Sequence, residues 1–282
     1  MASEGFGGLR VVAFESRRAE DMRLLIRRQG GEPLVAPSMR EVPLDNQQEA
    51  LAFSQRLFAG TLDVLILLTG VGTRTLAEVL ATRHPRAEII RALSRLTLVA
   101  RGPKPIIALG ELGLKPTLVV PEPNTWRDIL ATLDAHLPLQ GRRVAVQEYG
   151  ATNQELLQGL AQRAAEVIRV PVYRWALPED VEPLRRAIGA VCDGQADVLL
   201  FTSATQIEHV LQVAETMGRA EALRSAAGRC VVASIGPICS ETLRARGLPV
   251  DLEPLHPKMG SLLSEAARRA PELLARKRSS GT

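Results

Sequence analysis

Short apolar runs alternate with amphipathic segments along most of the chain. The runs that predict strands are RVVAF, EPLVA, DVLILL, LTLVA and TLVV in the first half, and RVAVQ, EVIRV, DVLLF, VVAS and VDLE in the second. Several are apolar throughout, as expected for strands that are covered on both faces. Alternating strand and helix patterns predict parallel sheets with right-handed crossovers. We therefore predict an α/β protein with two similar flavodoxin-like, doubly wound parallel sheets of about five strands each.

One of the intervening helices has a clear start signal. Asn153 is a candidate N-cap for the segment QELLQGLAQRAAE, residues 154–166. Within that segment Leu156, Leu157, Leu160 and Ala161 recur at helical spacing and form one apolar stripe. The pattern predicts an amphipathic helix over these residues.

The chain contains an internal duplication. DVLILLTGVGTRTL begins at Asp63 and DVLLFTSATQIEHV begins at Asp197, an offset of 197 − 63 = 134. Gly102-Pro103 is repeated as Gly236-Pro237 at the same offset, and GLRVVAFES resembles GRRVAVQEY at an offset of 133. Three blocks in one order at one spacing indicate two large related units, not a solenoid of short repeats.

Six loops are candidates for ligand binding, because open parallel sheets bind ligands beyond the carboxyl ends of their strands. Each follows a predicted strand and precedes a predicted helix, and they span residues 15–18, 69–73, 101–104, 148–153, 203–206 and 234–237. They are rich in Gly, Ser and Thr. The free N–H groups of helix starts attract carboxylates and phosphates.

Each loop also has a purely structural interpretation. TGVGT at 69–73 lacks the third glycine of a dinucleotide-binding motif and could be only a tight turn, although TSAT occupies the matching position in the second unit. Arg101 and Lys104 in RGPK are either solvated or near an anion. Arg17 and Arg18 are likewise a solvated pair or carboxylate anchors. Tyr173 is a core or interface residue, or an acid.

Composition narrows the class of protein. The 282 residues suit about two domains, and 46% hydrophobic with 23% charged residues is normal for a globular protein. No apolar run approaches the roughly 18 residues of a spanning helix, and no signal peptide is visible, so we expect a cytoplasmic protein without membrane contact. A net charge of +4 with 3% aromatic residues argues against a nucleic-acid partner and suits a small polyanionic ligand.

Neither metal nor cofactor chemistry is indicated. The three cysteines have no CxxC spacing, and the four histidines lie far apart, so we expect no metal site. We find no P-loop, no GxSxG elbow and no Ser-His-Asp order. The residues therefore predict a two-domain protein with an anion-friendly cleft, without a cofactor.

In their order along the chain, these blocks resemble bacterial uroporphyrinogen-III synthases. The segments that carry the resemblance are LILLTGVGTRTL, LVARGPKPIIALGELGL, VAVQEYGATNQELL, VPVYRW, LLFTSATQIEHVL and ASIGPICSETLRARGL. The resemblance implies that residues 1–38 join residues 176–282 in one discontinuous α/β domain. Residues 39–175 then form an inserted α/β domain, and two extended linker segments near SMREVP and PVYRWALP connect the two.

The resemblance also implies a reaction, the cyclisation of hydroxymethylbilane to uroporphyrinogen III with inversion of ring D and loss of water. It makes the protein a lyase of haem and sirohaem biosynthesis that needs no cofactor, and we expect a monomer. Tyr173 matches the family's linker tyrosine, a candidate acid that we expect to be helpful rather than essential. The expected substrate contacts are Arg17, Thr69, Gly70, Arg101, Gly102, Lys104, Tyr149, Gly150, Ser203, Ala204, Thr205, Ser234 and Gly236.

Two departures from the family pattern favour backbone contacts over side-chain contacts. This chain has Ile238 and Cys239 where other members have hydroxyls, and Gly70-Val71-Gly72 where some have Ser-Pro-Arg. Two other functions stay open. One is a noncatalytic synthase-like module for ligand binding or regulation, and the other is a sugar- or nucleotide-binding transferase.

Overall fold

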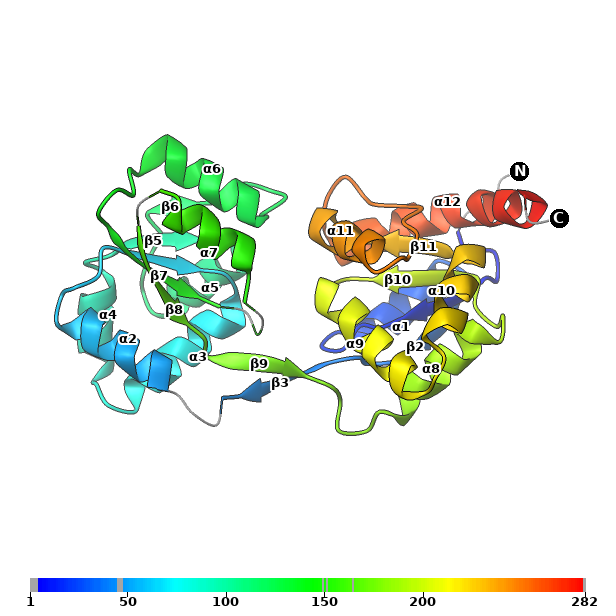
Figure 1. The fold of residues 1–282 in the computed structure, drawn as a ribbon, viewed down its shortest axis with the longest axis horizontal. Coiled ribbons are helices and arrows are strands. Elements are labelled where there is room, and N and C mark those ends of the chain that lie inside the picture. The colour runs from blue at the N-terminus through cyan, green and yellow to red at the C-terminus, as the bar shows by residue number, and fades with distance from the viewer. Residues whose placement is uncertain (1–4, 45–47, 149, 151, 164, 281–282) are drawn as a thin grey trace. The chain divides into compact units, whose positions relative to one another are not determined.

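The protein consists of two compact units in the computed structural model, which describes residues 5–44, 48–148, 150, 152–163 and 165–280. The discontinuous unit comprises Met1–Arg40 and Ala176–Thr282, and the inserted unit comprises Glu41–Trp175 (Figure 1). Two short strands at the unit boundaries, β3 (Arg40–Pro43) and β9 (Tyr173–Ala176), pair as a separate two-stranded sheet.

The discontinuous unit is built on a four-stranded parallel sheet in the order β11-β10-β1-β2. Its strands are β1 (Arg10–Ala13), β2 (Glu32–Val35), β10 (Val198–Phe201) and β11 (Val231–Ser234). Its helices are α1 (Ala19–Arg28), α8 (Glu182–Cys192), α9 (Ala204–Thr216), α10 (Ala220–Arg229), α11 (Pro237–Ala245) and α12 (Met259–Ser280). The predicted fifth strand VDLE contributes only an isolated bridge between Leu252 and Ala233.

The inserted unit has a five-stranded parallel sheet in the order β6-β5-β4-β7-β8. Its strands are β4 (Val64–Leu67), β5 (Thr97–Ala100), β6 (Leu118–Val119), β7 (Arg143–Gln147) and β8 (Glu166–Val170). Its helices are α2 (Gln48–Phe58), α3 (Gly70–Ala81), α4 (Arg86–Leu93), α5 (Pro103–Glu111), α6 (Trp126–His136) and α7 (Gln154–Ala161). The predicted α/β class with parallel sheets is confirmed.

Both sheets are covered on both faces, which explains why their central strands are apolar throughout. In the discontinuous unit, Val12 and Leu199 face one buried cluster, whereas Val11, Val198 and Leu200 face the other. The inserted unit repeats this division, and all four residues of β4 are buried. Successive side chains of a strand point to opposite faces, so a strand between two helical layers needs an apolar residue at every position.

The duplicated segments occupy equivalent places in the two sheets, but each sheet combines strands from both repeats. β1 pairs with β10 with Val11 opposite Val198, and β7 pairs with β4 with Val144 opposite Val64. Each pair thus joins one strand from the first repeat to one from the second. Read from β2, the discontinuous sheet follows the flavodoxin-like strand order, whereas the inserted sheet, read from β8, has a circularly permuted form of that order.

An ion pair is repeated with the duplication. Asp197 accepts hydrogen bonds from the backbone N–H and the guanidinium of Arg10, and Asp63 accepts the same set from Arg143. In both units the aspartate stands directly before the central strand and the arginine begins its neighbour. The hydrogen bond from the arginine side chain is the main reason why the pKa of each aspartate is lowered.

The helix predicted over residues 154–166 is shorter than expected. Asn153 caps it as predicted, since its side chain accepts the N–H of Leu156 at 2.7 Å, but the helix ends at Ala161, which is exposed. Arg163 lies just beyond and donates to the carbonyl of Gly159, which satisfies a free C-terminal acceptor. The following residues, 166–170, pair with β7 instead of continuing the helix.

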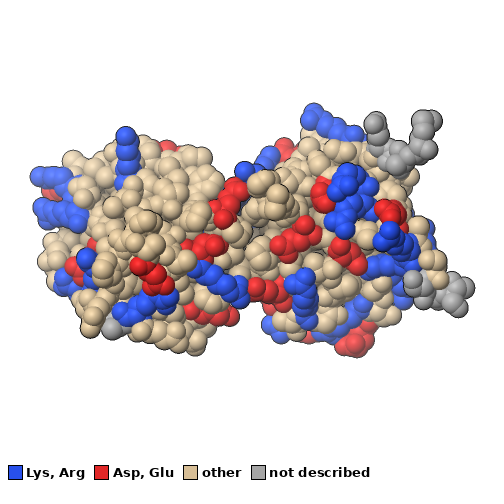
Figure 2. All heavy atoms as spheres, turned by 90° about the horizontal axis from the view of Figure 1, so that it is seen from above, with Lys and Arg blue, Asp and Glu red and all other residues tan. Residues whose placement is uncertain are grey.

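Basic and acidic side chains are interspersed on the face of the molecule shown in Figure 2. Exposed ion pairs formed within single helices or at their ends include Arg18 with Asp21 and Arg268 with Glu265. Among the described residues, no helix is both long enough and apolar enough to cross a membrane.

Candidate functional site

Helices α3 and α5 of the inserted unit begin at the carboxyl ends of β4 and β5, where the sequence predicted ligand-binding loops. Thr69 is the N-cap of α3, and its hydroxyl accepts the N–H of Gly72 at 3.0 Å. Gly102 is the N-cap of α5 with φ 84° and ψ −170°, a conformation that side chains disfavour, and Pro103 follows in the first turn. Both helix starts present backbone N–H groups suited to anions.

The hydroxyl of Tyr173 lies 3.3 Å from the hydroxyl of Thr69, and either atom can donate in this hydrogen bond. Tyr173 is only 3% exposed and packs in the apolar cluster of the inserted unit. The ring of Trp175 meets the Tyr173 ring edge-on, with centroids 5.5 Å apart. The tyrosine named from the sequence is therefore held at the start of α3 by contacts on several sides.

The other predicted residues of this unit lie close to the same place. Gly70 sits against the main chain of Lys104, where a Cβ would come 2.7 Å from the Lys104 carbonyl oxygen. Lys104, in the first turn of α5, is exposed, and Arg101, in the loop before that helix, is partly exposed. Gly150 forms a bridge to Arg174, next to Tyr173. Tyr149 lies outside the described residues.

Gln147, the last residue of β7, belongs to the site although the sequence reasoning did not identify it. It is fully buried, its side-chain oxygen accepts the N–H of Thr69 at 3.3 Å, and its amide nitrogen donates to the carbonyl of Glu148. Gly72 is required beside it, because any Cβ at that position would overlap the Gln147 amide. The available signal was a glutamine at the end of the otherwise apolar run VAVQ.

Glu148 and Arg169 form a second polar contact that the sequence did not reveal. The carboxylate of Glu148 is almost buried and accepts two hydrogen bonds of 2.9 Å from the Arg169 guanidinium, which raises the pKa of Arg169. Arg169 also donates to the hydroxyl of Thr152 at 2.7 Å. The ion pair joins the ends of β7 and β8 to the loop before α7.

In the discontinuous unit, Ser203 takes the place that Thr69 has in the inserted unit. It caps α9, and its hydroxyl accepts the N–H of Thr205 at 3.2 Å. Ala204 and Thr205 are the first two residues of that helix and are partly exposed. Glu15, two residues beyond the end of β1, accepts a hydrogen bond from the hydroxyl of Thr202. Arg17 is exposed two residues further on.

Ser234 and Gly236 shape the loop between β11 and α11. The Ser234 hydroxyl is fully buried and donates to the carbonyl of Gly236 at 3.0 Å, so it is engaged within its own loop. Gly236 is the N-cap of α11 and has an extended conformation, with Pro237 in the first turn. This loop therefore offers the backbone of a helix start, as Gly102 does in the inserted unit.

The described parts of the two units share one chemical character. Their carboxyl-end loops combine helix N-termini, capping hydroxyls and a few cations, and the described residues contain no group of three His, Cys, Asp or Glu that could hold a metal ion. The loops of each unit can bind carboxylates, and those of the inserted unit can also offer one phenolic proton, that of Tyr173.

Comparison with known proteins identifies relatives over nearly the whole chain. The model of the family described as "Uroporphyrinogen-III synthase HemD" matches residues 20–264. The chain is 28% identical over 267 residues to "Uncharacterized protein YjjA" of Bacillus subtilis, covering 94% of this chain and 97% of the relative.

Two solved structures that are similar to this chain are those of uroporphyrinogen III synthase from the extremely thermophilic bacterium Thermus thermophilus. The wild-type structure is 30% identical, covers 95% of this chain and 100% of its own, and has a TM-score of 0.55. A mutant structure is 27% identical, covers 97% of this chain and 100% of its own, and has a TM-score of 0.68.

Proposed function

Since the chain belongs to the uroporphyrinogen-III synthase family, we propose that it cyclises hydroxymethylbilane to uroporphyrinogen III. Ring D is inverted and one water is lost, which makes the protein a lyase of tetrapyrrole biosynthesis. We further propose that it is a monomer in the cytoplasm and that it acts without a cofactor. Membership of the family supports a synthase-type protein that acts on a tetrapyrrole.

The observation that carries the proposal is the hydrogen bond between Tyr173 and Thr69 at the start of α3. The Thr69 hydroxyl already accepts the N–H of Gly72, and it can donate its own proton to the Tyr173 oxygen. In that orientation Tyr173 donates its phenolic proton to the hydroxyl of the substrate. The Thr69 hydroxyl and the positive end of α3 then stabilise the phenolate that forms.

The step balances without an added reagent. The bond between the terminal carbon and the hydroxyl oxygen breaks, the electron pair leaves with the oxygen, and the Tyr173 proton completes a water molecule. The cation left on the substrate is delocalised over the adjacent pyrrole. The substituted α-carbon of ring D attacks this cation to form a spiro intermediate, and the bond from that carbon to its original bridging carbon then breaks, which leaves a cation on the bridging carbon. The free α-carbon of ring D closes the macrocycle on that bridging carbon and loses its proton, and this proton restores the phenol.

Choice of isomer depends on holding the substrate in one conformation, because the linear substrate also cyclises unaided to the uninverted type I product. We propose that the helix starts at Thr69, Gly102, Ser203 and Gly236 bind substrate carboxylates through backbone N–H groups. Positioning of this kind can contribute several kcal/mol to a barrier, about 7–11 in the best cases. Since little of Tyr173 is exposed, we assign it the smaller share.

The test is the ratio of type III to type I product from enzymatically generated hydroxymethylbilane. We expect the wild-type protein to form type III well above the spontaneous background. If only type I appears, the synthase function is refuted and a noncatalytic ligand-binding module remains. Assays after dialysis against a chelator test whether a metal is needed.

A double-mutant cycle tests the role of the hydroxyl pair. Tyr173→Phe and Thr69→Ala should each lower kcat by about tenfold, roughly 1.4 kcal/mol, and the double variant should lose little more than either. Thr82→Ala is the control, because Thr82 bonds the Val79 carbonyl at the opposite end of α3. A loss above a hundredfold for Tyr173→Phe would indicate an indispensable acid and contradict our assignment.

A further inference from the structure

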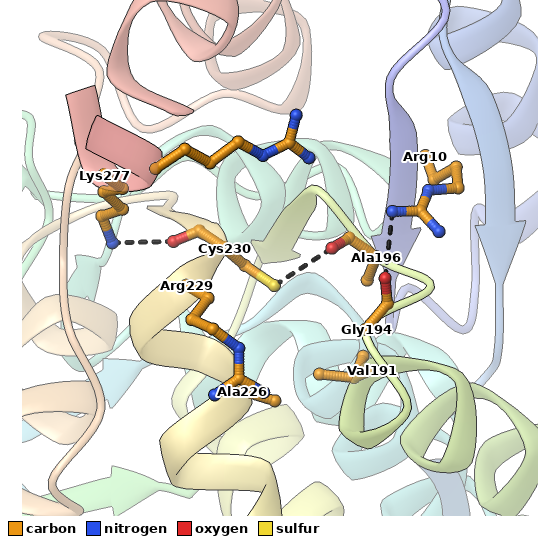
Figure 3. A pocket seen from close by; sticks show the side chains of 9 residues that line it. Arg10, Val191, Gly194, Ala196, Ala226, Arg229, Cys230 and Lys277 are labelled. Atoms are coloured by element: carbon orange, nitrogen blue, oxygen red, sulfur yellow. Dashed lines mark hydrogen bonds between the residues drawn. The ribbon is translucent and has the colours of Figure 1, made fainter. Parts of the chain in front are cut away.

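A cavity of about 320 Å³ lies in the discontinuous unit at the amino-terminal edge of its sheet (Figure 3). Arg10 begins β1, Ala196 lies two residues before β10, and Cys230 directly precedes β11. The loops of the proposed active site follow the opposite ends of these strands. The cavity is therefore a feature separate from that site.

Four cations line this cavity, and they come from three different parts of the chain. Arg10 and Arg278 both hold Asp197, and Lys277 holds Asp251 at 2.7 Å and the Cys230 carbonyl at 2.7 Å. The fourth, Arg229, is exposed and is hydrogen-bonded, among the described residues, only to Ser225 of its own helix.

Four cations line the cavity, and the carboxylates of Asp197 and Asp251 accept hydrogen bonds from three of them. The C-termini of α8, α10 and α12 end at the cavity and partly offset this positive charge. The fork-shaped guanidinium groups add a geometric preference for carboxylate or phosphate oxygens.

The equivalent corner of the inserted unit is filled with apolar side chains. At the offset of 134, Val191, Ala196 and Cys230 correspond to larger leucines, which are the buried residues Leu57, Leu62 and Leu96. The strand registers support this alignment, since Val198 pairs with Val231 as Val64 pairs with Thr97. The hollow thus comes from smaller side chains at three matched positions and is not a property of the fold itself.

The C-terminal part of α12 extends beyond the length of its counterpart α6 and carries two cations at the same corner. Helix α6 of the inserted unit ends at His136, which corresponds to residue 270, whereas α12 continues to Ser280. The added turns carry Lys277 and Arg278. These two residues and Arg10 lie outside the range 20–264 that the family model matches.

The cavity is hollow where the inserted unit has leucines, and α12 brings two further cations to it. We therefore propose that the cavity binds a small organic or inorganic polyanion through carboxylate or phosphoryl oxygens. The guanidinium groups of Arg229 and Arg278 bind the anionic groups, and Val191 and Ala226 contact any carbon skeleton. The volume is near the lower end for small-molecule sites, so a linear tetrapyrrole does not fit. The site is thus distinct from the one for the proposed substrate.

Calorimetric titration with inorganic pyrophosphate and, separately, with citrate tests the proposal, at constant ionic strength on the full-length protein. We expect saturable binding with a Kd below about 1 mM for at least one probe. The probe that binds identifies phosphoryl or carboxylate as the preferred group. Arg229→Gln and Arg278→Gln should each weaken binding by about tenfold. Arg276→Gln is the matched control, because Arg276 is on the same helix but pairs with Glu272 and does not line the cavity.

A second variant keeps the test decisive if the arginine changes disturb α12. Ala196→Leu introduces the residue that fills the equivalent position as Leu62, so it should fold and abolish binding while synthase activity is retained. Wild-type protein that binds neither probe at millimolar concentration overturns the proposal. Binding that survives unchanged in Ala196→Leu and in both arginine variants also overturns it. Neither result bears on the product-isomer assay.

Discussion

Asp197 and Asp63 occupy equivalent places in the two units but differ in burial, and this difference predicts different costs of removing their charge. The Asp197 side chain is 6% exposed and accepts four hydrogen bonds, three from Arg10 and one from Arg278. The Asp63 side chain is 29% exposed and accepts three, all from Arg143, of which the longest is 3.4 Å. Each aspartate can be replaced by asparagine with little change in volume.

The expected magnitude follows from these contacts. Breaking a buried ion pair costs about 3–5 kcal/mol when the remaining charge stays buried. Arg10 and Arg278 are 40% and 63% exposed and can regain water, so we expect about 2 kcal/mol for Asp197→Asn, roughly thirtyfold in the unfolding equilibrium. Asp63→Asn should cost less than half as much, because its carboxylate is already partly hydrated.

Urea unfolding measures both variants. Both tryptophans, Trp126 and Trp175, lie in the inserted unit, so their fluorescence follows that unit, while circular dichroism follows the helices of both. Asp197→Asn should move the dichroism transition more than Asp63→Asn does. Equal shifts, or no shift for Asp197→Asn, would refute the reasoning from burial.

Acid provides an independent check on the same pair. The pKa of Asp197 is lowered in the folded state, first by the hydrogen bond from Arg10. Its contribution to stability is therefore complete above the unfolded pKa, near about 3.9, and is lost as the pH falls through the lower folded value. The gap between wild type and Asp197→Asn should narrow below about pH 4. A gap that stays constant down to about pH 2 would contradict the assignment.

Two further predictions use matched positions. Gly102→Ala should destabilise the protein by about 1–3 kcal/mol in thermal unfolding, because φ is 84° and a Cβ would lie 2.9 Å from Asn124 Oδ1. Gly236→Ala should destabilise it less, because φ of Gly236 is extended. Equal losses of stability would contradict this explanation. Burial raises the pKa of Cys230 and of Cys239 to about 11. A thiol reagent at about pH 8 should therefore modify the partly exposed Cys192 first, and the other two only on unfolding. The stability of the protein should also fall between about pH 9 and about pH 11, because the thiols ionise in the unfolded state before they do so in the folded state. Rapid modification of all three thiols in the folded protein would be the contrary result.

Features that depend on neighbouring residues could be predicted from the sequence. All predicted strands except VDLE form strands, and Thr69, Ser203 and Asn153 cap helices where hydroxyl or amide side chains precede a helical pattern. The predicted extension of this helix to residue 166 was wrong, because the helix ends at Ala161 and residues 166–170 pair with β7 instead. The roles of the site residues and the domain boundaries stay predictions.

By itself, the sequence determined the α/β class, the duplication and the loops at which helices begin, because hydrophobic period, capping residues and repeat spacing are local or linear properties. Which strands pair depends on the folded chain, since Val11 lies opposite Val198, 187 residues away in the sequence. The folded structure also shows that Gln147 accepts a hydrogen bond from the backbone N–H of Thr69. It further shows that the corner of the sheet filled by Leu62 in the inserted unit is hollow at Ala196 in the discontinuous unit. Such contacts join residues far apart in the chain, and their free energy depends on burial and distance, which no single segment encodes.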